Sequence, residues 1–109
     1  MKRYASHFLF LSGHGYLKQY VVEIGEEQYV SRIFPLAEEV ENTEWLPGVI
    51  ALLPETEAGK LLFDKCHNIL AEVPPGIEKE LPGMVPWLYF PFDFITMQPG
   101  AGTQRKRLQ

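Results

Sequence analysis

Apolar and polar positions alternate along the first part of the chain in the two-residue period that predicts β-strands. From Lys2 to Leu11 the side chains fall on two sides of an extended chain: Tyr4, Ser6, Phe8 and Phe10 on one side, Ala5, His7, Leu9 and Leu11 on the other. Both sides are largely apolar. The pattern therefore predicts one strand over Lys2–Leu11.

Glycine turns divide the next segment into two more predicted strands. Gly13 and Gly15 flank His14 and lead into Tyr16–Ile24, and Gly25-Glu26-Glu27 leads into Gln28–Leu36. Short glycine turns between alternating segments favour antiparallel hairpins. The first third of the chain therefore predicts a three-stranded meander.

The pattern weakens and then resumes in the middle of the chain. Residues Ala37–Glu44 are acidic and predict a loop or a short helical turn. Pro47-Gly48 predicts a turn into a short buried strand over Val49–Leu53, which Pro54 ends.

The hydrophobic period then changes from two to that of a helix. Leu62, Cys66, Ile69, Leu70 and Val73 follow one another at intervals of three, four or one, which is the apolar stripe of an amphipathic helix. We expect a helix near Glu57–Val73 that packs on the sheet through Leu62, Cys66, Ile69 and Leu70. Pro74-Pro75-Gly76 should end it, because proline lacks the amide hydrogen.

The last third predicts a connector and two strands. Residues 74–86 are rich in proline and predict an extended connector. Trp87–Phe94 predicts a strand that Pro91 confines to an edge, a bulge or a strand end, and Thr103–Gln109 an exposed final strand. We therefore expect one domain over residues 1–109, a β-rich α+β fold: an antiparallel sandwich or open barrel of about five or six strands with one packed helix.

Charge and hydropathy limit the classes of partner. Between Glu23 and Glu57 there are nine acidic residues and one basic residue, Arg32, which argues against nucleic acid as the partner. Arg105, Lys106 and Arg107 form a small basic cluster near the end of the chain. The longest apolar run, Phe8–Leu11, is far too short to span a bilayer. We expect a cytoplasmic protein that binds no membrane.

Candidate catalytic groups are few. Cys66 and His67 are neighbours that diverge on a helix, so they do not form a nucleophile and base. The sequence lacks the spacing of a metal site, and we favour a protein without cofactor, metal or enzymatic activity. The alternative is a small metal-dependent enzyme in which His7, His14 and Asp93 converge.

The aromatic segment Trp87–Phe94 is the most unusual feature of the sequence. Its rings predict a core, a ligand platform or a partner-binding surface; the candidate partner-binding residues are Trp87, Tyr89, Phe90, Phe92 and Phe94. We expect a non-enzymatic interaction or accessory module with a homo-oligomer, such as a homodimer, or another protein as its partner. A small-ligand pocket lined by aromatic rings is a further alternative.

Three short segments, Tyr20–Gly25, Ser31–Ile33 and Thr43–Ile50, carry a resemblance to a known family. Over Tyr16–Ile50 the chain resembles the small β-sandwich composite domain that flanks the barrel of amidohydrolase-type metal-dependent hydrolases. The chain departs from that pattern because Val49-Ile50 runs into an apolar strand instead of a metal-binding His-x-His, and it is too short for the barrel. The resemblance implies a stand-alone β domain without hydrolase activity, with Trp87–Phe94 and Thr103–Gln109 as its last strands.

Overall fold

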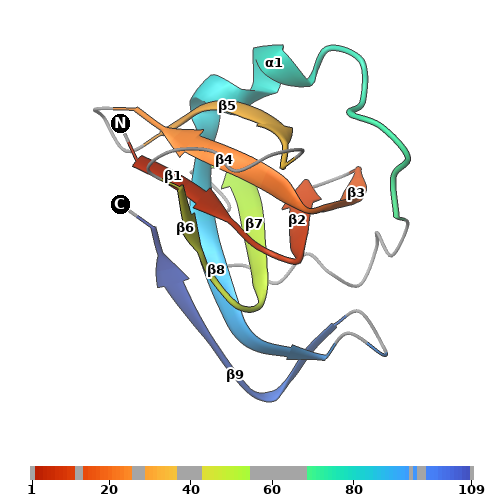
Figure 1. Cartoon of the computed structure of the whole chain (residues 1–109), viewed down its shortest axis with the longest axis vertical. Helices are drawn as coiled ribbons and strands as arrows, with labels where there is room; N and C mark the ends of the chain where they lie inside the picture. Colours follow the sequence, from red (N-terminus) through yellow and green to blue (C-terminus); the bar gives the residue numbers. More distant parts are fainter. Residues whose placement is uncertain are drawn as a thin grey trace.

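A computed structural model describes residues 2–11, 14–25, 29–36, 43–54, 69–93, 95 and 98–108. In these residues the chain forms two mixed sheets. The first sheet has the order β5-β4-β1-β6 and the second sheet the order β3-β2-β7-β8-β9 (Figure 1). The strands are β1 (Lys2–Ala5), β2 (Phe8–Leu11), β3 (Gly15–Lys18), β4 (Tyr20–Ile24), β5 (Val30–Pro35), β6 (Thr43–Trp45), β7 (Val49–Pro54), β8 (Met84–Asp93) and β9 (Gln98–Arg107).

Three chain segments pass from one sheet to the other, so the two sheets are one sheet folded along a corner. β1 continues into β2, β3 into β4, and β6 into β7. The neighbours are the same on both sides of the corner, because β1 pairs with β4 and β6 while β2 pairs with β3 and β7. Counted through the bends, the described residues form six long strands, which agrees with the five or six predicted. Strands that bend between sheets are the usual way to build such corners.

Hydrogen bonds between the bent strands continue across the corner. The backbone N–H of Gln19 donates to the carbonyl oxygen of His7 (3.0 Å), and that of Leu46 donates to the carbonyl oxygen of Ala5 (2.8 Å). The buried Ser6 hydroxyl donates to the carbonyl oxygen of Phe8 (2.7 Å). These bonds satisfy backbone groups that the bend would otherwise leave without partners.

Two residues at the corner have positive φ angles. Gln19 has φ 54° and Gly48 has φ 104°. A side chain at Gly48 would meet the backbone, because a Cβ atom there would lie 2.3 Å from the carbonyl oxygen of Tyr89. Glycine is therefore required at position 48, where the third bent strand, β6–β7, changes direction and passes close to β8.

The second sheet is buried on both faces. Its inner face, with the first sheet, encloses one apolar cluster, which includes Leu9, Leu11, Leu17, Val22, Ile50, Leu52 and Leu108. Its outer face carries a second buried cluster: Phe10, Tyr16, Val49, Ala51, Leu53, Tyr89 and Phe92. Neighbouring residues of β2 and β7 belong to different clusters, which explains why both sides of these strands are apolar.

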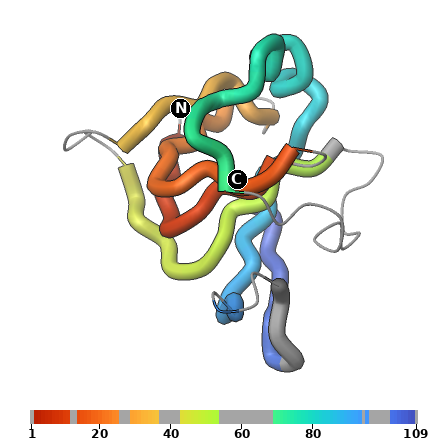
Figure 2. Tube along the Cα trace, turned by 90° about the vertical axis from the view of Figure 1, so that its right-hand side faces the viewer, coloured from red at the N-terminus to blue at the C-terminus, as the bar shows by residue number. Residues whose placement is uncertain are grey.

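A short helical segment covers one end of the inner cluster. The α-helix α1 (Ile77–Glu80) is followed by the 3-10 helix η3 (Leu81–Gly83). Ile77 and Leu81 insert into the inner cluster, and α1 lies above β5 at the top of the molecule in Figure 1 and Figure 2. The α+β, β-rich fold class is confirmed.

The structure corrects three predicted elements. Lys2–Leu11 is not one straight strand, because the chain bends at Ser6–His7 and continues in the other sheet; the same holds for Tyr16–Ile24, which bends at Gln19. Residues 57–68 of the predicted helix, with Leu62 and Cys66, lie outside the described residues. Its last part is wrong: Ile69 is 59% exposed and forms a parallel bridge to Tyr16 instead of continuing a helix.

The sheets also contain parallel pairs, which the antiparallel prediction did not include. β6 runs parallel to β1, and β7 runs parallel to β2, because the first and third bent strands point the same way. The predicted hairpins are confirmed, with β2 antiparallel to β3 and β4 antiparallel to β5. Of the three alternatives predicted for Pro91, an edge, a bulge or a strand end, the structure favours the bulge, since the register of β8 and β9 shifts between Phe90 and Phe92.

Candidate binding groove

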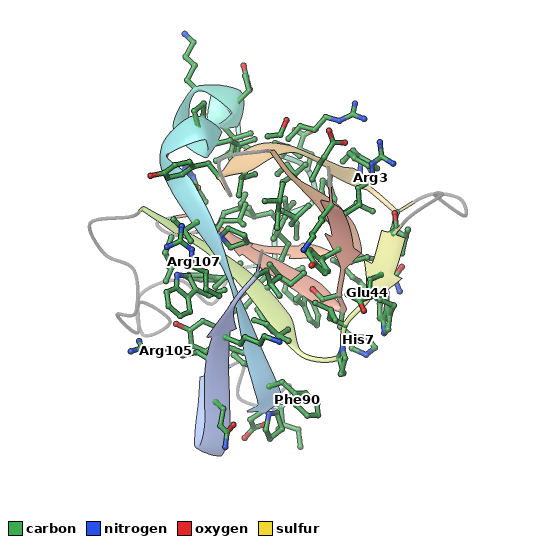
Figure 3. All side chains as sticks on the ribbon, turned by 90° about the vertical axis from the view of Figure 1, so that its left-hand side faces the viewer. Arg3, His7, Glu44, Phe90, Arg105 and Arg107 are labelled. Carbon is green, nitrogen blue, oxygen red and sulfur yellow. The ribbon has the colours of Figure 1, made fainter. Side chains whose placement is uncertain are left out.

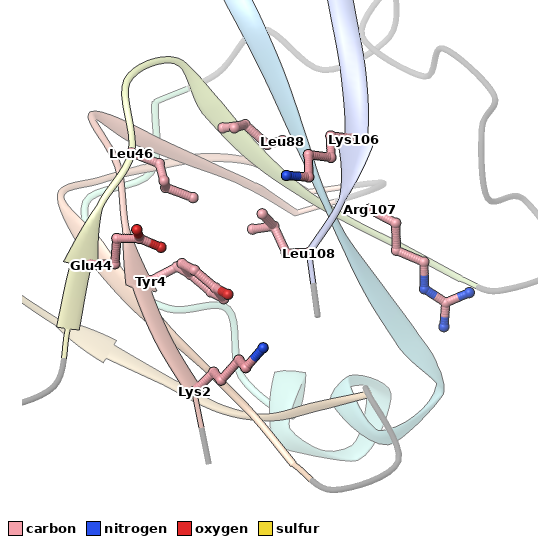
Figure 4. A pocket seen from close by; sticks show the side chains of 8 residues that line it. All are labelled: Lys2, Tyr4, Glu44, Leu46, Leu88, Lys106, Arg107 and Leu108. Atoms are coloured by element: carbon pink, nitrogen blue, oxygen red, sulfur yellow. The ribbon is translucent and has the colours of Figure 1, made fainter.

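A groove opens between the edge of the first sheet and the inner face of the β8–β9 hairpin. We call it the seam groove; it has a volume of about 450 Å³. It is lined by Lys2, Tyr4, Glu44, Leu46, Leu88, Lys106, Arg107 and Leu108. Residues from β1 and β6 face residues from β8 and β9 across it (Figure 4).

The seam groove combines an apolar floor with basic groups. Leu46, Leu88 and Leu108 supply the floor. The ammonium groups of Lys2 and Lys106 point toward the middle of the groove, whereas the guanidinium of Arg107 points away from it (Figure 4). Among the described residues that line the groove, Glu44 is the single acid. A few charged groups around an apolar floor are typical of a binding site.

Tyr4 and Glu44 lie side by side in this groove. They are paired residues of the parallel strands β1 and β6. Burial raises the pKa of the Tyr4 hydroxyl, and the nearby Glu44 carboxylate raises it further. The Tyr4 hydroxyl is therefore protonated at neutral pH.

Phe90 extends the groove along β8. It is 48% exposed and, with Leu88, Gln104, Arg105 and Lys106, lines a smaller hollow of about 170 Å³. The two hollows share Leu88 and Lys106. In Figure 3, Phe90 lies at the end of the hairpin below His7 and Glu44. The exposed ring and the seam groove therefore form one continuous surface.

The other aromatic residues proposed for partner binding lie elsewhere. Tyr89 is 1% exposed and Phe92 8% exposed, and both belong to the outer cluster of the second sheet. Trp87 is half-buried against the same cluster, with Arg105 above its ring at 5.5 Å. Phe94 lies outside the described residues. Of the five, Phe90 offers the most exposed ring in the part of the chain described.

Tyr89 and Arg105 meet on the outer face of the hairpin. They are paired residues of β8 and β9. Burial raises the pKa of Tyr89, although the positive charge of Arg105 and its hydrogen bond act in the opposite direction. Arg105 and Arg107 lie on the side of the hairpin away from Glu44 and His7 (Figure 3). The basic cluster of Arg105, Lys106 and Arg107 is thus divided: the side chain of Lys106 points toward the groove, and the two arginine side chains point away from it.

The residues of the enzyme hypothesis do not converge. His7 packs edge-on against Trp45, with ring centroids 4.9 Å apart. His14, at the other end of β2, pairs with Glu80 at 3.2 Å. Asp93, at the end of β8, accepts a hydrogen bond from the backbone N–H of Ile95 (2.9 Å). Each group is engaged at a different place, so they do not form a joint catalytic site.

No three histidine, cysteine, aspartate or glutamate side chains gather into a metal-binding group in the described ranges. Cys66, His67 and Asp64 lie outside those ranges. Within the same ranges, no helix is long and apolar enough to cross a membrane.

An ion-pair row crosses the outer face of the first sheet. The buried Glu23 carboxylate accepts hydrogen bonds from Arg3 (3.1 Å) and Arg32 (3.0 Å), which lie on the strands at either side. Burial by itself would raise the pKa of Glu23, but the hydrogen bonds and charges of the two arginines outweigh it and hold the pKa below its ordinary value. Glu23 therefore stays ionised at neutral pH and joins three strands.

Comparison of the chain with protein-family models, with curated proteins and with solved structures finds no match. The resemblance to the composite domain of amidohydrolases therefore stays a prediction. The groove itself was not predicted from the sequence. Its residues come from both ends and the middle of the chain, and the basic cluster at Arg105–Arg107 was the only local signal for it.

Proposed function

We propose that this chain is a non-enzymatic interaction module that binds another protein through the seam groove and the adjoining ring of Phe90. One observation carries the proposal: an apolar floor, two inward ammonium groups and a half-exposed aromatic ring share one open surface. Exposed aromatic rings beside apolar hollows are typical of the residues that dominate protein interfaces. The scattered positions of His7, His14 and Asp93 support binding over catalysis.

The first experiment measures the mass of the full chain by light scattering behind a sizing column over a wide concentration range. We expect a monomer, because the proposal assigns the surface to a different protein. A dimer that Phe90→Ser converts to a monomer would show that a second copy occupies this surface, and would overturn the assignment to another protein.

The second experiment selects binders of the full chain from a library of random peptides and measures their dissociation constants. We expect binders that lose at least about tenfold in affinity on Phe90→Ser. Ile69→Ser is the matched control. Ile69, like Phe90, is a large apolar residue that is exposed, but it lies beside β3 at the far edge of the second sheet. It should leave affinity unchanged.

Two results would overturn the proposal. One is the absence of any selected binder. The other is a set of binders whose affinity falls equally with Ile69→Ser and Phe90→Ser, which would place binding outside the groove or trace it to general destabilisation.

A further inference from the structure

We propose that the partner adds an extended acidic segment to the open edge of β9, as a further strand of the second sheet. The inference rests on the proposed function and names the chemistry of the partner that binds beside Phe90. Addition of a peptide strand to an exposed sheet edge is a recurrent mode of recognition, in which backbone hydrogen bonds give affinity and alternate side chains give specificity.

β9 is an edge strand in the part of the chain that the structure describes. It stands last in the order of the second sheet, and β8 is its one neighbour among the described strands. The β8–β9 hairpin extends away from the other strands, and β9 lies at the outer margin of the molecule (Figures 1 and 2). An open edge presents backbone donors and acceptors that another strand can use.

The register with β8 determines which backbone groups face this edge. The N–H of Leu108 donates to the carbonyl oxygen of Pro86 at 3.0 Å, so these two residues form a hydrogen-bonded pair. In an antiparallel ladder such pairs alternate with pairs that share no hydrogen bond. Lys106 therefore bonds to β8, whereas the N–H and C=O groups of Arg105 and Arg107 face away from β8. Two donors and two acceptors are thus directed toward an incoming strand.

The same residues give the edge its charge. Arg105, Lys106 and Arg107, which we call the basic strip, follow one another in β9, and the first two are exposed. Within the described ranges, no carboxylate forms an ion pair with any of the three. Neighbouring strands lie about 4.8 Å apart, so residues of the added strand would lie directly opposite these cations. Acidic residues there would form cross-strand ion pairs, which favours an acidic segment.

The two sides of the basic strip would contact different parts of the partner. Arg105 and Arg107 lie on the outer side of the hairpin, whereas Lys106 points to the inner side (Figures 3 and 4). On that inner side, Gln104 and Lys106 line the hollow of about 170 Å³ that the ring of Phe90 also lines. An acid opposite Lys106 would therefore be followed, two positions along, by an apolar side chain that lies beside this hollow.

The basic strip disfavours a second copy of this chain at the same edge. Antiparallel pairing about Lys106 would bring the three cations of one copy opposite those of the other, and like charges directly opposite one another are destabilising. Charged residues on edge strands commonly prevent such self-association. An acidic segment turns this repulsion into attraction.

A peptide also fits the edge better than a nucleic acid. The outward C=O groups of Arg105 and Arg107 can pair with the N–H groups of a peptide backbone, whereas phosphates only accept hydrogen bonds. A peptide strand therefore uses the donors and the acceptors of the edge together.

The first test uses peptides selected against the full chain from a random library. We expect an acidic residue to be enriched, with an apolar residue two positions away. Lys106→Glu should weaken binding at least about tenfold, and lysine in place of the acid should restore binding to this variant. Lys18→Glu is the control for net charge and should change affinity little, because Lys18 is exposed at the end of β3, on the opposite edge of the second sheet.

A second variant locates the acid. Lys2 points into the seam groove from β1, in the first sheet, and does not adjoin the open edge of β9. Lys2→Glu should therefore weaken binding less than Lys106→Glu does. Equal losses would place the acid in the groove and overturn strand addition at β9.

Hydrogen exchange and backbone methylation test the strand itself. The amides of Arg105 and Arg107 should exchange at least about tenfold more slowly when a selected peptide is bound, whereas the amide of Lys106, already bonded to β8, should change less. N-methylation of the peptide amides that face β9 should abolish binding, and methylation of the alternate amides should be tolerated.

The outcomes separate this inference from the proposed function. Peptides that need Phe90 but carry no acid, tolerate N-methylation at every position or leave exchange at Arg105 and Arg107 unchanged would overturn strand addition and leave the interaction module standing. Competition by a short oligothymidylate as strong as that by the peptides would also overturn the inference. Failure to select any peptide would overturn both.

Discussion

The backbone N–H of Gln19 donates a 3.0 Å hydrogen bond to the carbonyl oxygen of His7 at the place where two neighbouring strands bend together from one sheet into the other. Gln19 adopts a left-handed conformation there, with φ 54°. The strand β1–β2 bends at the buried Ser6, and the strand β3–β4 bends at Gln19 with its positive φ. The hydrogen bond between Gln19 and His7 holds the two bends side by side. The corner therefore depends on both strands at once.

The bend at Gln19 predicts a specific response to substitution. Gln19→Gly should change the free energy of unfolding by less than about 1 kcal/mol, since glycine adopts positive φ freely but gains entropy in the unfolded chain. Gln19→Val should cost about 1–2 kcal/mol, because β-branched residues are strained at positive φ. Urea unfolding of the two variants measures the difference. Equal stability of both would contradict the left-handed bend.

The close approach at Gly48 predicts a larger loss. Gly48→Ala would place a Cβ atom 2.3 Å from the carbonyl oxygen of Tyr89 at φ 104°, so the backbones of β7 and β8 must move apart. We expect a loss of about 2–4 kcal/mol in the free energy of unfolding. Gly102→Ala is the control, because nothing lies within 4 Å of its Cβ position. Similar stability of the two variants would show that Gly48 is not constrained.

Burial on both faces of β2 predicts that two adjacent residues matter equally. Leu9 belongs to the inner cluster and Phe10 to the outer cluster, and both are fully buried. Leu9→Ala should cost about 2–5 kcal/mol and Phe10→Ala about 3–5 kcal/mol. Thermal or urea unfolding checks both. A cost below about 0.5 kcal/mol for Phe10→Ala would mean that the outer face of this strand is open to solvent.

The Glu23 row predicts a pH dependence. Glu23→Gln should lower the free energy of unfolding at neutral pH by about 1–3 kcal/mol, since the neutral amide removes the buried negative charge that strengthens the hydrogen bonds from Arg3 and Arg32. Because folding lowers the pKa of Glu23, its stabilisation is complete above the ordinary value of 4.5 and is lost as the pH falls through the lower folded value.

The difference in stability between the wild type and Glu23→Gln should therefore shrink below pH 4.5. Urea unfolding at neutral and acidic pH measures it. Glu78→Gln, on the exposed side of α1, is the control and should differ little from the wild type at either pH. A gap for Glu23→Gln that stays constant with pH would contradict the lowered pKa.

The hairpins and the entry into β7 were predictable from the sequence, because their signals are local, whereas α1 and η3 were not, since the prolines of residues 74–86 predict an extended connector. Glycine turns beside alternating segments gave the two hairpins, and Pro47-Gly48 marked the entry into β7. The parallel pairing of β1 with β6 was not predictable, since Arg3 and Thr43 are far apart in the sequence and neither pattern specifies the other. The bends were hidden because alternation continues across Ser6 and His7.

The candidate site was predicted only in part for the same reason. The alternation of β8 places Tyr89 in the outer cluster and Leu88 and Phe90 on the groove side. Both sides of this strand are apolar, so the sequence alone did not distinguish the buried rings from the exposed one. The groove itself is lined by Lys2 and Tyr4 together with Lys106, which are far apart in the sequence.

The folded sheet also determines how the molecule comes apart. Each of three segments carries hydrogen bonds in both sheets, so neither sheet can open while the other keeps its full set of strands. We therefore expect the two described sheets to lose their structure as a single cooperative unit. Amides of β2, β4 and β7 should therefore report the same opening free energy in hydrogen exchange, despite lying in different sheets.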